Sequence, residues 1–321
     1  MIRTEICDLF GIEHPIILGG MLWVGGADLA AAVSDAGGLG LLGAGGLTPD
    51  DIIRATETIR GRTEKPFGVN VPLLRPDAGE MIQAALTGGA AVIATASGSP
   101  KRYTKMIKDE GAKVIHVVPN VNLAEKAQVA GVDAVVAEGY EAGGHNGHDE
   151  IATLALVPQV VRAVDVPVIA AGGIADGKGL IAALALGAKG VQMGTRFLAA
   201  SESAAHENYK NAVLTMSDTD TCITGRTTLG PTRAVKNRLT EMILNAERGG
   251  ATPEELYEMI GEGRSARACF EGDIDEGSLY CGQIGGYITE ILPAREVIER
   301  TVREAGAIVG MLHSALNGNR L

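Results

Sequence analysis

Several residue types and patterns are scarce in this chain of 321 residues, and each scarcity narrows the class of protein. Aromatic residues make up only 3% of the sequence, so aliphatic side chains and 44 glycines must supply the core and the turns. The four cysteines are scattered and include no C-x-x-C pair, which argues against a zinc site and a disulfide framework. No run of about 18 apolar residues and no apolar signal segment occurs, so we expect a cytoplasmic protein without a membrane span.

Excess positive charge is also lacking, because the formal net charge is −11. An acidic surface does not attract nucleic acid or an anionic membrane, so we predict neither as a partner. The length suits one α/β barrel, which needs about 250 residues plus insertions.

Short apolar runs are the most regular feature that is present. Eight of them occur, mostly spaced by roughly 20 to 30 residues, and helix-like stretches such as 28–36, 48–60 and 179–186 lie between them. The runs cover residues 16–20, 39–42, 67–71, 91–95, 114–118, 134–138, 167–172 and 190–194. This alternation predicts an α/β fold, a closed (β/α)8 TIM barrel, with an open doubly wound sheet as the alternative.

The β/α rhythm stops after Phe197, which predicts how the chain is divided. We expect the barrel in residues 1–199 and a mainly helical insertion after strand 8, in residues 200–286, that caps the barrel mouth and contacts substrate. Residues 287–321 should hold a C-terminal helix, over about 293–316, that packs back on the barrel. We expect a homodimer formed through the insertion or this helix.

Two glycine-rich turns follow the seventh and eighth runs, where TIM barrels often bind phosphate. The first includes Ala171, Gly172 and Gly173, and the second includes Gln192, Gly194 and Thr195. Glycine exposes backbone N–H groups, and a helix that starts nearby adds partial positive charge. The pair predicts a phosphate site; the alternative is two turns that merely close loops.

Other strand ends carry groups that suit a flat, polar ligand. Gly19 and Gly20 precede Met21 after the first run, and paired glycines let a ligand approach the backbone, although a tight turn is the alternative. Asn70 ends the third run, where its amide could bind a heterocycle or form an Asx turn. Glu138 ends the sixth run and could bind sugar hydroxyls or cap a helix.

The sixth run opens into a long glycine-rich loop that contains two histidines. His145 lies where a packed core histidine is unexpected, so we predict that it reaches a ligand and acts as the catalytic acid or base. His148 is expected to be a solvated loop residue. A metal site that uses these histidines with Asp149 or Glu150 lacks a further ligand at a firm spacing, so we predict no metal.

Sequence motifs along nearly the whole chain resemble one FMN-barrel superfamily. They are HPIILGGM, AVSDAGGLGLLGAG, KPFGVNV, AEGYEAGGHNG, PVIAAGGIADGKG and GVQMGTRF, with EGDIDEGS and GQIGG near the end. The superfamily includes the flavin type of enoyl-acyl-carrier-protein reductase and the nitronate monooxygenases, also called 2-nitropropane dioxygenases.

The resemblance implies non-covalent FMN and assigns roles to the residues already singled out. The FMN phosphate would contact Ala171, Gly172, Gly173, Gln192, Gly194 and Thr195. The flavin ring would lie against Gly19, Gly20 and Met21, with Asn70 nearby, and Glu138 would bind the ribityl chain. His145 would lie beside the isoalloxazine ring, and we place its neighbours Gly143 and Gly144 among the cofactor-binding residues.

Finer motifs favour the reductase within this superfamily. EGDIDEGSLYCGQIGG, SESAAHENYK and GVNVPLLRP resemble the enoyl reductases, whereas DEIATLALVPQV occurs in related form among the monooxygenases. Asn146 departs from the G-H-I-G of the reductases and from the G-H-R-G of one monooxygenase class, which leaves specificity open.

We therefore expect reduction of trans-2-enoyl thioesters by NADH or NADPH, with hydride relayed through FMN. The alternative is nitronate oxidation with O2, and a third is a phosphate-binding barrel without redox activity. Acyl carrier protein is acidic, so a reductase that uses it predicts a basic patch near the mouth. The candidates are Arg226, Arg233, Lys236 and Arg238, unless this run is a solvated helix face.

Overall fold

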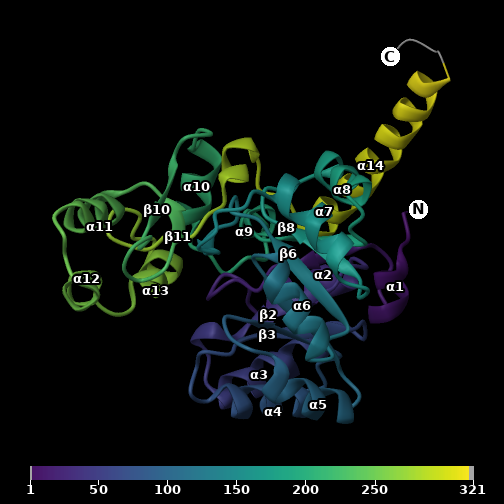
Figure 1. The fold of residues 1–321 in the computed structure, drawn as a ribbon, viewed down its shortest axis with the longest axis horizontal. Coiled ribbons are helices and arrows are strands. Elements are labelled where there is room, and N and C mark those ends of the chain that lie inside the picture. The colour runs from purple at the N-terminus through teal and green to yellow at the C-terminus, as the bar shows by residue number, and fades with distance from the viewer. Residues whose placement is uncertain (1, 318–321) are drawn as a thin grey trace.

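Eight parallel strands form the centre of the molecule (Figure 1). The computed structural model describes residues 2–317, so Met1 and residues 318–321 of the predicted barrel and C-terminal segments lie outside the described residues. The barrel strands are β1(Ile16–Leu18), β2(Gly40–Gly43), β3(Phe67–Pro72), β4(Val92–Ala96), β5(Lys113–Val118), β6(Ala134–Glu138), β8(Val168–Ala171) and β9(Gly190–Met193). Their order is β1-β9-β8-β6-β5-β4-β3-β2.

Hydrogen bonds between the first strand and the residue before the second close this sheet into a barrel. Leu18 N–H donates to the Leu39 carbonyl over 2.9 Å, and Leu39 N–H donates to the Ile16 carbonyl over 3.0 Å. The predicted TIM barrel, with a strand at each of the eight apolar runs, is thereby confirmed. The alternative prediction of an open doubly wound sheet is wrong.

The strands read as continuous apolar runs because both of their faces are buried. One face fills the barrel interior with Ile17, Leu41, Ile115 and Val136, and the short helix α1(Glu5–Phe10) packs against this interior cluster. The other face packs against the surrounding helices in a second, larger cluster.

Helices follow the strands around the barrel, as the alternation predicted. They are α2(Ala27–Asp35), α3(Pro49–Arg60), α4(Ala78–Thr87), α5(Lys101–Asp109), α6(Val121–Val129), α7(Thr153–Ala163), α8(Gly177–Ala185) and α9(Thr195–Leu198), with a 3-10 turn η1(Ala44–Gly46). Thr48 and Asp51 form a reciprocal capping box around Pro49, which explains why α3 begins there.

The insertion after β9 is folded from helices and a small sheet, and Figure 1 shows it beside the barrel. Its helical elements are α10(Glu207–Thr215), α11(Arg238–Arg248), α12(Pro253–Ile260), α13(Arg264–Ala266), the π turn η2(Arg267–Glu271) and the 3-10 turn η3(Gln283–Tyr287). The strands β10(Thr221–Thr224) and β11(Thr232–Val235) pair with β7(Gly144–His145) in an antiparallel sheet that sequence analysis did not predict. This sheet therefore joins the insertion to the loop of the candidate histidine.

The last helix, α14(Ala294–Leu316), packs against α8 and α2. Its C-terminal end extends past the rest of the molecule in Figure 1. Within residues 2–317, every helix is too short or too polar to cross a membrane.

Candidate active site

A cavity of about 850 Å³ lies at the C-terminal ends of the barrel strands, and the insertion covers part of it. Loops that are far apart in the sequence converge there because parallel strands of a barrel all end on one face. All the residues predicted to bind or act on a ligand line this cavity. They are Gly19, Gly20, Met21, Asn70, Glu138, Gly143, Gly144, His145, Ala171, Gly172, Gly173, Gln192, Gly194 and Thr195.

The two glycine-rich turns form a cradle of backbone amides at one part of the cavity. Gly172 and Gly173 follow β8 with φ angles of 92° and 72°, a left-handed conformation that favours glycine. Gly194 ends the β9 segment and caps α9, and Thr195 Oγ1 accepts a hydrogen bond of 3.0 Å from Gly282 N–H of the insertion. The turns carry few side-chain atoms, so this cradle fits a phosphate group.

The first backbone amides of α8 are not free to bind an anion in this cradle. The sequence had led us to expect that a helix starting nearby would add positive charge there. Asp176 caps the helix, and its Oδ1 accepts hydrogen bonds from Lys178 N–H over 2.9 Å and from Gly179 N–H over 3.0 Å. An anion would therefore be held mainly by the loop amides before this helix.

The ends of β1 and β3 meet on another wall of the cavity. A Cβ atom on Gly20 would lie 2.2 Å from Cγ of Asn70, so the Asn70 amide lies directly against the Gly20 backbone. Within residues 2–317 no hydrogen bond engages the Asn70 side chain, so the alternative Asx turn does not form. The amide is available to a planar ligand over these two strands.

Glu138 lies at the end of β6 and faces the cavity. Burial without a compensating positive charge raises the pKa of its carboxyl to about 7. The group can therefore be protonated near neutral pH and donate, as well as accept, a hydrogen bond.

His145 is held at the cavity by backbone pairing with the insertion. It lies on the two-residue strand β7, where its Cα is paired with that of Thr232 on β11. Its imidazole opens to the cavity, 6.5 Å from the Tyr280 ring between centroids. Surrounding protein lowers the pKa of His145 below 6.5 by desolvation, so the ring is mainly neutral at pH 7.

Asn146, the residue that departs from the family motif, stabilises the turn beside His145. Its Nδ2 donates to the carbonyls of Ala142 and Gly144 over 3.0 and 2.9 Å. Its backbone N–H donates to the Pro231 carbonyl over 2.8 Å. The amide thus acts on the loop backbone.

The acidic residues after His148 are engaged by other side chains. Asp149 Oδ2 accepts a hydrogen bond of 2.7 Å from Asn120, and Glu150 forms an ion pair of 2.7 Å with Arg226. His148 is exposed, as expected, although it also lines the cavity.

The basic patch predicted from Arg226, Arg233, Lys236 and Arg238 does not form as an unpaired surface. Arg233 is only 5% exposed, because its side chain points inward from β11 and donates to the Tyr140 carbonyl over 2.8 Å. Arg226 forms an ion pair with Glu150, and Arg238 forms one with Glu276, with 3.3 Å between Nη1 and Oε1. Strand β11, which was not predicted, is the reason that this run is not one exposed helix face.

Several cavity residues were missed by sequence analysis. His116 was not singled out from the sequence, yet it lines the cavity, and burial lowers its pKa to about 4. The insertion contributes the side chains of Tyr209, Ser265, Ser278 and Tyr280. The motif GQIGG marked the neighbourhood of Tyr280, but only the folded chain shows which of these side chains face the cavity.

A barrel with two glycine-rich turns and a histidine at the C-terminal ends of its strands is typical of cofactor-dependent enzymes. The chain belongs to the nitronate monooxygenase family, whose model matches residues 3–304. It is 33% identical to a (3aS,4S,5R,7aS)-5-hydroxy-7a-methyl-1-oxo-octahydro-1H-indene-4-carboxyl-CoA dehydrogenase of Mycobacterium tuberculosis, over 95% of this chain and 96% of the relative. It is 30% identical to a nitronate monooxygenase of Paraburkholderia phytofirmans, over 98% of each chain.

Two solved structures resemble this chain in both sequence and fold. FabK from Thermotoga maritima is 44% identical, with a TM-score of 0.94 over 98% of this chain and 100% of that one. A nitroalkane oxidase from Streptomyces ansochromogenes is 30% identical, with a TM-score of 0.83 over 96% and 100%. These relatives are oxidoreductases from flavin-dependent families, which confirms the predicted class of enzyme.

Proposed function

We propose that this protein is an FMN-dependent enoyl-thioester reductase that uses NADH or NADPH. The observation that carries the proposal is the likeness to FabK, an enoyl-acyl-carrier-protein reductase, at 44% identity over nearly the whole of both chains. The substrate would be a trans-2-enoyl thioester carried by acyl carrier protein or by coenzyme A.

The cavity residues suit FMN. The amides of Gly172, Gly173 and Gly194 would hold its phosphate, and Glu138 would bind the ribityl hydroxyls. Asn70 would bind the edge of the ring, which would lie against the backbone at Gly20. When bound, FMN supplies two-electron hydride chemistry, which amino-acid side chains lack.

Besides holding FMN, the protein must bind the thioester and provide a proton for it. Apolar cavity residues such as Leu74, Val117 and Leu123 can contact an acyl chain. His145 can give a proton to the substrate α-carbon when it is protonated, and water can serve where it is not.

A second candidate is nitronate oxidation, which the family match and the 30% identical relatives favour. The lowered pKa of His145 also suits this activity, because a neutral imidazole can remove a proton from a nitroalkane. This reaction would use O2 and would not require a nicotinamide nucleotide.

One experiment separates the two activities. The purified protein, loaded with FMN, is mixed without oxygen with NADH or NADPH in a stopped-flow instrument, and a trans-2-enoyl-CoA is then added. We expect rapid bleaching of the visible flavin absorbance by one nucleotide and its return with the enoyl thioester. Flavin that neither nucleotide reduces, but that an alkyl nitronate does reduce, would instead identify a monooxygenase. A protein that binds no flavin would contradict both candidates.

A further inference from the structure

Tyr280 is a second proton-bearing side chain at the part of the cavity where His145 lies. Both residues line the cavity, and their ring centroids are 6.5 Å apart with planes inclined by 49°. Tyr280 comes from the segment before η3, whereas His145 comes from the loop after β6. The folded insertion therefore adds a phenol to a wall that the barrel loops begin.

Backbone contacts on both sides fix the position of Tyr280. Val235 N–H of β11 donates to the Leu279 carbonyl over 2.9 Å. The hydroxyl of Tyr209, a buried residue of α10, donates to the Tyr280 carbonyl over 2.9 Å. The ring is thus presented by a segment that is anchored to the same strand as His145.

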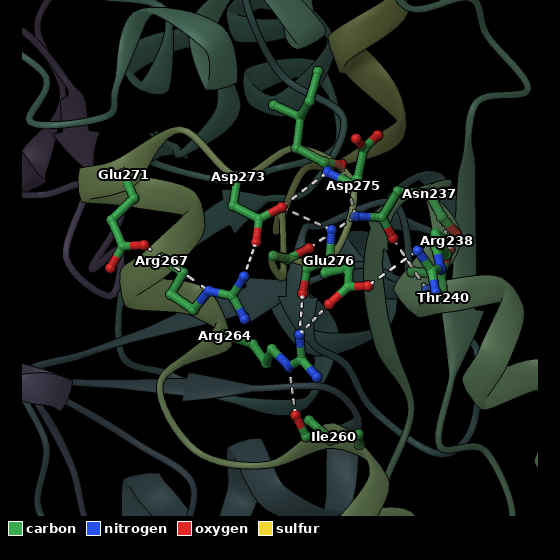
Figure 2. A network of polar contacts seen from close by, with 12 residues as sticks. Asn237, Arg238, Thr240, Ile260, Arg264, Arg267, Glu271, Asp273, Asp275 and Glu276 are labelled. Carbon is green, nitrogen blue, oxygen red and sulfur yellow. Dashed lines mark hydrogen bonds and ion pairs between the residues drawn. The ribbon is translucent and has the colours of Figure 1, made fainter.

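A network of ion pairs anchors the loop that leads to Tyr280, and Figure 2 shows it. Glu276 accepts a hydrogen bond of 3.1 Å from Arg264, and Asp273 is paired with Arg267. Asn237 Nδ2 donates to the carbonyls of Ile274 and Gly277 over 2.9 and 2.8 Å. The acidic stretch EGDIDEGS therefore forms a structural support for Tyr280.

We propose that Tyr280 is a catalytic residue whose hydroxyl donates a hydrogen bond to the thioester carbonyl oxygen of the substrate. This inference rests on the proposed reductase function and adds a residue to it. The carbonyl oxygen and the α-carbon of an enoyl thioester are separated by two bonds, so neighbouring groups on one wall can serve both.

The electron movement explains why a donor is needed there. Hydride, which comes originally from the reduced nicotinamide, forms a new C–H bond at the β-carbon. The pair of electrons of the double bond then moves towards the carbonyl oxygen, which becomes an enolate oxygen. A hydrogen bond to this oxygen lowers the barrier because its charge is greatest along the reaction path. The α-carbon finally takes a proton from His145 or water, which gives the saturated thioester.

Tyr280 suits donation without proton loss. Burial raises the pKa of its phenol above the usual value near 10, so the hydroxyl keeps its proton at pH 7. It can therefore polarise the carbonyl throughout the reaction, while proton transfer is left to other groups.

The test compares Tyr280→Phe with the wild-type holoenzyme in separate half-reactions. Tyr280→Phe keeps the ring and removes only the hydroxyl. We expect flavin reduction by the preferred nicotinamide nucleotide to be unchanged, and reoxidation by a trans-2-enoyl-CoA to slow by about 100-fold. Affinity for the saturated acyl-CoA should change less than the rate, because its carbonyl carries no developing charge. Tyr257→Phe is the matched control, since Tyr257 is 65% exposed on α12.

The outcomes separate this inference from the function on which it rests. If wild-type enzyme fails to pass electrons to the enoyl thioester, the proposed reductase function is wrong. If wild-type enzyme is active and Tyr280→Phe reoxidises equally fast, only the role of Tyr280 is wrong. Equal slowing of both half-reactions would show a structural effect and would also overturn the catalytic role.

Discussion

At the scale of single residues, desolvation at the cavity shifts the pKa values of two side chains in opposite directions. It raises the pKa of Glu138 to about 7 and lowers the pKa of His145 below 6.5. In both cases desolvation disfavours the charged form, which is anionic for the carboxyl and cationic for the imidazole. The cavity therefore favours neutral groups near pH 7, which suits an apolar acyl substrate.

The pH dependence of the rate should reveal which way His145 moves a proton. As an acid, His145 acts only when protonated, so kcat/KM for enoyl reduction should fall as pH rises through its pKa, which lies below 6.5. We expect His145→Gln to remove this limb and to lower the rate at acid pH by about 100-fold or more. Steady-state kinetics from pH 5 to about 8 would measure it.

His206→Gln is the control, because His206 caps α10 and does not line the cavity. With a nitroalkane as the substrate, a rate that rises with pH through this range, and loses that rise in His145→Gln, would instead indicate proton removal by His145 and would favour nitroalkane oxidation.

At the scale of elements, close packing of α8 against α14 ties the C-terminal helix to the barrel. Gly177 begins α8, and a Cβ atom there would lie 2.4 Å from Ala305 N and 2.7 Å from the Thr301 carbonyl. Backbone atoms cannot move away as a flexible side chain can, so the two helices require a glycine at this contact.

This contact predicts opposite effects for two glycine substitutions. Gly177→Ala should lower the free energy of unfolding by roughly 1–3 kcal/mol, because the methyl group overpacks the helix contact. Gly306→Ala should be neutral or stabilising by up to about 1 kcal/mol, because alanine favours a helix and, beyond its own helical turn, the added Cβ meets no atom within 4 Å. Urea unfolding followed by circular dichroism would measure both, and equal effects of the two substitutions would contradict this close packing of α8 against α14.

At the scale of the whole molecule, the insertion and the barrel are joined at several separate points. Gly282 N–H donates to Thr195, Arg233 donates to the Tyr140 carbonyl, and β7 pairs with β11. Trp23, the single tryptophan of the chain, donates to Ser265 Oγ over 3.2 Å and contacts the Phe270 ring edge to face, with centroids 5.7 Å apart. We expect these contacts to make the insertion unfold with the barrel.

The fluorescence of Trp23 can test this coupling, because the residue lies at the boundary between barrel and insertion. In flavin-free protein, the fluorescence change during urea unfolding should coincide with the loss of far-ultraviolet circular dichroism. A fluorescence transition at clearly lower urea concentration would show that the insertion separates from the barrel first. Ser265→Ala, which removes the hydrogen bond, should shift the native emission without changing the coincidence.

Sequence patterns predicted the barrel well because its determinants are local. Each strand is a short apolar run buried on both faces, and each is bounded by residues that end strands or begin helices, such as Thr48 before α3. Once eight strands alternate with helices, the ends of the strands must share one face. The predicted ligand residues therefore had to meet in one cavity, as they do.

Only the tertiary structure decided what the insertion does at this cavity. Strands β10 and β11 have four residues each and β7 has two, so they leave almost no periodic pattern in the sequence. Their pairing buries Arg233, which takes this residue out of the expected basic patch, and it holds His145 in place. Tyr280 reaches the cavity through contacts with α10 and β11 that are distant in sequence. The sequence by itself determined the barrel and the residues at its strand ends, because these depend on local patterns. The residues that surround His145 were decided by long-range pairing of strands, for which the sequence has no local pattern.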